Sequence, residues 1–158
     1  MPETTKATAT DAELILKLYD LRREQKMRKA REWYGGQFWP ESFEEIQQLM
    51  MGFDKEENAY FRQVLSYWDM ACSLVLHGTL DPNLFFDTNG EGAFVYTKLK
   101  PFISQMRAAF NAPEFCASME RLFESTPEWR QRISRMETNL AHFREVRKKQ
   151  MTQGQAAA

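Results

Sequence analysis

The sequence is poor in the side chains that most enzymes use for catalysis and metal binding. Its 158 residues include two cysteines and two histidines. It contains no phosphate-binding loop, no G-x-S-x-G nucleophile motif, no H-E-x-x-H zinc motif and no C-x-x-C pair. We therefore expect no cofactor and no metal centre, and the sequence favours a non-enzymatic function.

Long apolar runs and a strong net charge are also missing. No apolar run approaches the ~20 residues that a helix needs to cross a bilayer. The formal net charge is −1, so no global field draws the chain to nucleic acid or to a membrane surface. The N-terminus lacks a charged start followed by an apolar run, so we expect no signal peptide. Cys72 and Cys116 both lie in apolar helical contexts, which favours buried thiols and a cytoplasmic location.

What the sequence does have is helical periodicity around one apolar stretch. Hydrophobic residues make up 43% of the chain, enough for one domain with a real core. Between positions 54 and 78 a set of apolar residues falls on one helical face: Phe61, Val64, Leu65, Trp68, Ala71, Cys72 and Val75. A second apolar stripe lies beside it, so a helix over about 55–77 should be buried at the centre of a bundle.

The remaining segments predict more helices and no sheet. Thr10 and Glu13 have capping-box spacing and should open a long helix that ends near Tyr34. Ser42 with Glu45 predicts the start of a second helix. Pro101 should kink or divide the helical segment 93–110. We therefore predict an all-α, single-domain bundle of six or seven helices over residues 10–151, with flexible tails at 1–9 and 152–158.

Asp69 is unusual because it lies within the apolar central helix. Between Phe61 and Leu76 the only charged residues are Arg62 and Asp69. A buried carboxylate must be paired, so we predict that Asp69 is a structural buried polar residue that contacts an arginine such as Arg62 or Arg107.

The segment from Asp87 to Gly92 partly matches a calcium-binding loop. Asp87, Asn89, Glu91 and Gly92 satisfy positions one, three, five and six of an EF-hand loop. Position twelve, which should supply a bidentate carboxylate, is Lys98. The competing interpretation is an Asn-Gly turn between helices.

Arg135 and His142 carry a resemblance to an enzyme family. An arginine, six residues and a histidine resemble the Arg-to-His motif of HEPN-type ribonucleases, which are also small helical bundles. Residues seven apart share a helix face, so the two side chains could contact one phosphate. The polar residue that usually follows the arginine is Met136 here. The resemblance implies a ribonuclease as the alternative function, and a solvated helix face is the other interpretation.

A broader resemblance runs from about Phe61 to Arg107. The stretch F-R-Q-V-L-S-Y-W-D-M-A-C-S-L-V-L-H-G-T-L-D-P-N-L-F-F, followed by K-L-K-P-F-I-S-Q-M-R, resembles an uncharacterised family of bacterial helical proteins classed as a domain of unknown function. The shared features are the Trp68-Asp69 pair, the turn at Gly78 and a short Leu-Phe helix. This resemblance implies an all-α domain and supplies no catalytic residue.

We expect the chain to act as a protein–protein interaction or scaffolding module, with a protein partner or a second copy of itself. The expected partner site is the polar half of the first helix and the aromatic residues after it: Trp33, Tyr34, Phe38 and Trp39. Their alternative role is to cap the end of the bundle. Basic clusters on the first and last helices predict either a solubilising face or anion binding. A calcium- or lipid-responsive module is a third interpretation.

Overall fold

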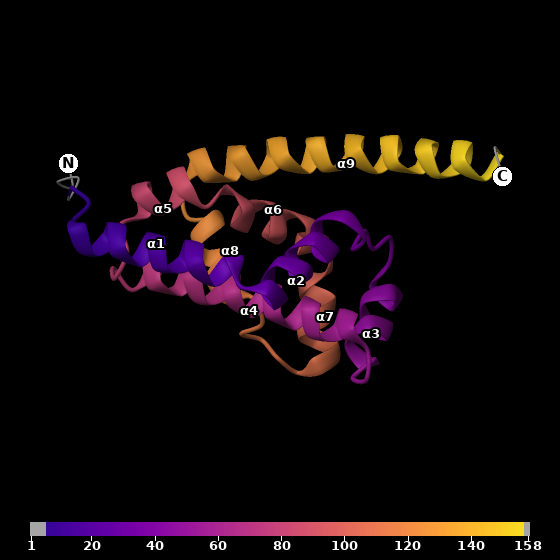
Figure 1. The fold of residues 1–158 in the computed structure, drawn as a ribbon, viewed down its shortest axis with the longest axis horizontal. Helices are drawn as coiled ribbons and strands as arrows, with labels where there is room; N and C mark the ends of the chain where they lie inside the picture. The colour runs from indigo at the N-terminus through magenta and orange to yellow at the C-terminus, as the bar shows by residue number, and fades with distance from the viewer. Residues whose placement is uncertain (1–5, 157–158) are drawn as a thin grey trace.

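The computed structural model describes residues 6–156, which fold as one helical domain (Figure 1). Its helices are α1 (Ala9–Arg23), α2 (Gln25–Gly36), α3 (Phe43–Met51), α4 (Glu56–Leu76), α5 (Pro82–Thr88), α6 (Gly90–Leu99), the 3-10 turn η1 (Lys100–Phe102), α7 (Ile103–Phe110), α8 (Ala117–Phe123) and α9 (Pro127–Ala156). No strand occurs within residues 6–156. The predicted all-α bundle is confirmed.

Helix α4 forms the centre of the bundle. Trp68, Ala71 and Cys72 on this helix are fully buried. Helix α2 packs along α4, α8 packs against another part of it, and α3 and α6 also contact it. The helix is closed by Gly78, whose φ of 71° lies in the left-handed region that favours glycine. The expected central helix is therefore confirmed.

The expected single first helix is wrong, because the chain breaks at Glu24. This residue has an extended backbone (φ −55°, ψ 142°), and its carboxylate accepts the Met27 backbone N–H at 3.0 Å. Glu24 thus ends α1 and caps α2. The change of direction lays α2 along α4 and buries its apolar side, so the polar half of this segment does not project from the bundle.

The first capping box also lies two residues earlier than expected. Thr8, rather than Thr10, caps α1: the Thr8 hydroxyl accepts the Asp11 N–H, and the Asp11 carboxylate accepts the Thr8 N–H. The sequence contains the same spacing twice, so spacing alone could not choose between the two pairs.

Helix α9 lies along one side of the bundle and extends beyond it (Figure 1). At ~1.5 Å per residue, its 30 residues span about 45 Å. Ile133 and Leu140 are buried against the domain. Residues 152–156, expected as part of a tail, continue α9, while residues 1–5 and 157–158 of the expected tails lie outside the described residues.

The length and hydropathy of the helices bear on membrane insertion. Among residues 6–156, no helix is both long enough and apolar enough to cross a bilayer.

Candidate functional site

A cavity of about 730 Å³ opens beside the central helix. One wall is α4, the other is the segment that connects α7 to α8, and Met50 at the end of α3 closes one side. Its lining residues are Met50, Ala59, Phe61, Arg62, Gln63, Leu65, Ser66, Asp69, Glu114, Phe115 and Cys116. We call this feature the Asp69 groove. Its volume lies within the ~300–1,000 Å³ typical of small-molecule sites.

Asp69 joins the two walls of the groove. Its Oδ1 accepts the backbone N–H of Met119 at 3.0 Å. Met119 is the third residue of α8, and the N-cap residue of that helix, Cys116, supplies no side-chain hydrogen bond. Asp69 therefore caps α8 from a neighbouring helix, and its negative charge is favoured at the helix N-terminus.

The prediction that an arginine pairs with Asp69 is wrong. Asp69 is half-buried rather than fully buried, and the ion pairs found among the described residues do not include it. Arg62 donates instead to the Asn58 side chain, and Arg107 pairs with Glu120 at 2.8 Å. The hydrogen-bond partner of Asp69 Oδ1 is a backbone amide, which the sequence could not indicate because Met119 lies 50 residues away.

The connection from α7 to α8 is held by Arg107. Its Nε donates to the Phe115 carbonyl oxygen at 3.0 Å, while its Nη1 contacts Glu120 on α8. The next residue, Cys116, has φ 54°, a left-handed conformation that is uncommon for a residue with a side chain. Arg107 thus holds the backbone of Phe115, which together with Cys116 lines the groove.

The two cysteines are not suited to nucleophilic chemistry. Burial raises the pKa of both Cys72 and Cys116 well above the usual thiol range, and the negative charge of Asp69 raises both further. Thiolates are the reactive form, so these thiols are inert at neutral pH. The groove therefore offers no activated thiol nucleophile.

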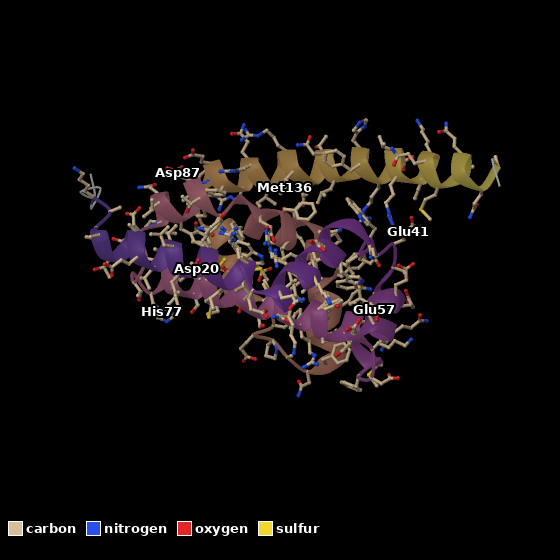
Figure 2. The ribbon with its side chains drawn as sticks, viewed as in Figure 1. Asp20, Glu41, Glu57, His77, Asp87 and Met136 are labelled. Atoms are coloured by element: carbon tan, nitrogen blue, oxygen red, sulfur yellow. The ribbon has the colours of Figure 1, made fainter. Side chains whose placement is uncertain are left out.

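Two of the three candidate calcium ligands are engaged in other hydrogen bonds. Asp87 is an exposed residue within α5 and lies near the start of α9 (Figure 2). The Asn89 side chain is buried and donates to the Phe85 carbonyl oxygen. Glu91 accepts two hydrogen bonds from Arg31, at 2.7 and 2.6 Å. Within the described part of the chain, no three His, Cys, Asp or Glu side chains converge as a metal site would require.

Lys98, at position twelve of that motif, is a buried cation. It is 1% exposed, and its Nζ donates to the Tyr34 carbonyl oxygen at 2.6 Å. The Nζ also lies 3.8 Å from the centre of the Trp39 ring. Burial, together with the positive charges of Arg144 and Arg147, lowers the pKa of Lys98 to about 7.

The four aromatic residues expected at a partner site surround this lysine or lie close to it. Trp33, Tyr34 and Phe38 are buried and their rings contact one another, while Trp39 is half-buried. The Tyr34 hydroxyl donates to the Val95 carbonyl oxygen on α6. These side chains pack at the end of the bundle, and of the four Trp39 is the most accessible to a partner.

Arg135 and His142 are both exposed on α9. They belong to a side of the helix that differs from the one carrying the buried Ile133 and Leu140. Neither lines the Asp69 groove.

Sequence comparison identifies the family of the chain. Residues 7–129 match the family model described as "Domain of unknown function (DUF4760)". The chain belongs to this family. The DUF4760 match covers much more of the chain than the segment 61–107 on which the family resemblance was based, and it stops early in α9. Searches of curated proteins and of solved structures found no significant match.

Proposed function

We propose that this DUF4760 protein is a non-enzymatic interaction module that self-associates through the projecting end of α9. The proposal rests on apolar side chains that are exposed on the C-terminal half of α9. Phe143, Val146 and Met151 are 54%, 38% and 56% exposed. Phe143 and Val146 lie three residues apart and so share a helix face, and exposed apolar residues grouped on one face are typical of interaction surfaces.

Charge indicates what the α9 end would contact. The segment 127–156 carries seven Lys and Arg residues against three Glu, a net charge of +4. The rest of the chain carries 14 basic and 19 acidic residues, a net charge of −5. Two copies of α9 would therefore repel each other, whereas α9 and the acidic remainder of a second copy attract.

An acidic corner lies at the same end of the molecule as the projecting part of α9. It is formed around α3 and the start of α4 by five exposed glutamates: Glu41, Glu44, Glu45, Glu56 and Glu57. Figure 2 shows Glu41 and Glu57 at this end, with His77 and Asp87 toward the opposite one. Within one chain Lys148 already contacts Glu41 at 3.0 Å. Because both surfaces lie at one end, a two-fold dimer can pair each α9 end with the acidic corner of its partner.

The test is sedimentation velocity at low and high salt. The wild-type chain should form dimers at low ionic strength and dissociate as salt screens the charges. Phe143→Ser should give monomers at the same concentration. Leu16→Ser is the matched control, because Leu16 is 64% exposed but belongs to α1; this variant should still form dimers. A wild-type chain that stays monomeric at about 100 μM, or equal effects of the two substitutions, would refute the proposal.

The ribonuclease alternative is carried by Arg135 and His142. If they cleave RNA, the purified protein should degrade a mixed RNA pool and His142→Ala should abolish the activity. Equal residual activity in both proteins would indicate a contaminant. Binding of the dimerisation-defective variant to anionic vesicles would instead favour the lipid-responsive interpretation. A bacterial origin and a cytoplasmic location remain predictions.

A further inference from the structure

The Asp69 groove combines an apolar lining with a carboxylate that has a free oxygen. Asp69 uses Oδ1 to accept the Met119 N–H. Among the hydrogen bonds and ion pairs of residues 6–156, none involves Oδ2. The carboxylate lines the cavity and is half-buried. A partly desolvated carboxylate is stabilised by a cation that enters beside it.

The cations near this carboxylate are held by other groups. Arg62 is the only Lys or Arg among the lining residues that the structure describes. Its Nε donates to Asn58 Oδ1 at 2.9 Å. Arg107 contacts the Phe115 carbonyl oxygen through Nε and Glu120 through Nη1, while its Nη2 is buried with no partner among the described residues. Neither guanidinium forms an ion pair with Asp69.

The apolar lining is suited to a hydrophobic ligand body. Met50, Phe61, Leu65 and Phe115 contribute side chains from three parts of the fold. Two of them are aromatic, and aromatic faces attract cations as well as apolar groups. Glu114 is the other acidic lining residue, so the acids outnumber the cation, which disfavours anionic ligands.

We infer that the Asp69 groove binds a small molecule that joins an ammonium group to an apolar or aromatic body. The ammonium pairs with Asp69 Oδ2 while the body covers Phe61, Leu65 and Phe115. The cavity of about 730 Å³ accommodates a ligand of this size. This site is separate from the α9 end, so it is independent of the proposed self-association.

The test uses three probes of one shape and different charge: 4-phenylbutylamine, 4-phenylbutan-1-ol and 4-phenylbutanoate. Binding to the full chain is measured at pH 7 by calorimetry and by chemical-shift changes of the Phe115 and Cys116 amides. We expect the amine to bind about tenfold more tightly than the alcohol, and the carboxylate to bind more weakly than both. Equal affinity for amine and alcohol, or no binding at millimolar concentrations, would overturn the inference.

Two variants locate the interaction. Asp69→Asn retains an oxygen that can accept the Met119 N–H and removes the charge, so it should reduce amine affinity to that of the alcohol. Ser66→Trp keeps Asp69 but fills the exposed rim of the groove, and should weaken both probes. Amine binding that survives in both variants would place the site elsewhere. If Asp69→Asn fails to fold, the wild-type probe comparison and Ser66→Trp still decide the question.

Two controls separate this result from general effects. Asp20→Asn removes one negative charge from an exposed position on α1 and should leave amine binding unchanged. If Asp20→Asn weakened amine binding as much as Asp69→Asn does, net charge would explain the effect and the proposed site would be refuted. Phe143→Ser should bind the amine like the wild type. If Phe143→Ser no longer forms dimers but still binds the amine, the self-association and the groove are shown to be independent, and failure of one proposal can be told from failure of the other.

Discussion

The Nζ of Lys98 on α6 lies 2.6 Å from the backbone carbonyl oxygen of Tyr34 in the last turn of α2. Carbonyl groups in the last turn of a helix lack intrahelical partners, and the helix dipole favours a cation there. Lys98 therefore links the end of α2 to α6, and its Nζ also packs against the neighbouring ring of Trp39. The cost is that an ammonium group is buried without a carboxylate partner.

The first prediction is that Lys98 makes stability depend on pH. Burial lowers its pKa from 10.5 to about 7 in the folded chain. Between these values the unfolded chain binds more protons than the folded chain, so the free energy of unfolding rises with pH. Below pH 7 both states are protonated and the folded state bears the full cost of burying the charge.

The measurement is the difference in melting temperature between the wild-type chain and Lys98→Met from pH 6 to pH 10. Lys98→Met lacks this titration. The melting temperature of the wild type should therefore rise by on the order of 5 °C relative to that of the variant as pH increases. Lys100 and Lys148 titrate in both proteins, so their contributions cancel in the difference. A constant difference across this range would show that the folded-state pKa of Lys98 is not lowered.

The second prediction concerns the cap that Asp69 provides to α8. Asp69→Ala leaves the Met119 N–H without its acceptor and should lower the free energy of unfolding by about 1 kcal/mol. Asp69→Asn should lower it less, because the amide oxygen can still accept. Urea denaturation of the three proteins measures both effects. A loss of about 3–5 kcal/mol for Asp69→Ala, the value for breaking a buried ion pair, would argue against this assignment.

Several parts of the fold could be predicted from local signals. The apolar stripe locates α4 within one residue at each end, Ser42 caps α3, and Pro101 lies in the 3-10 turn that divides α6 from α7. In each case the signal lies within or directly beside the segment whose structure it specifies. Local chemistry was therefore sufficient for these boundaries.

The features that were missed depend on contacts between distant segments. Glu24 is a good helix former, so nothing in its neighbourhood marks the break between α1 and α2. Lys55 is the N-cap of α4 and provides no side-chain hydrogen bond, so no capping side chain marks the start of this helix. Lys98 is buried because it contacts a carbonyl group 64 residues earlier in the chain. The Asp69 groove was missed for the same reason, since one wall comes from the α7–α8 connection.

The third prediction separates packing from partner binding among the aromatic residues. Trp33 is 9% exposed and its ring contacts Tyr34, Phe38 and Tyr60. Trp33→Ala should therefore lower the free energy of unfolding by about 3–5 kcal/mol. Trp39→Ala should cost less, because Trp39 is half-buried. Thermal melts together with sedimentation test both, and near-normal stability of Trp33→Ala with lost self-association would identify Trp33 as a partner anchor.

The last prediction concerns Gly92, where α6 packs against Trp68 of the central helix. A Cβ atom on Gly92 would lie 2.8 Å from Cε3 and 3.1 Å from Cζ3 of Trp68. Trp68 is fully buried, so its ring cannot move without disturbing the core. Phe123 confines the same space, since its Cζ would lie 3.3 Å from the added atom.

Gly92→Ala should accordingly destabilise the fold, although alanine favours a helix over glycine by about 1 kcal/mol. Overpacking a core costs about 1–3 kcal/mol, so the net loss should be about 1–2 kcal/mol. Gly90→Ala is the matched control on the same helix, because its Cβ would meet only the flexible end of Arg132 at 3.8 Å. That variant should be neutral or slightly more stable. Urea denaturation compares the two, and equal stability would mean that α6 can shift away from Trp68 at little cost.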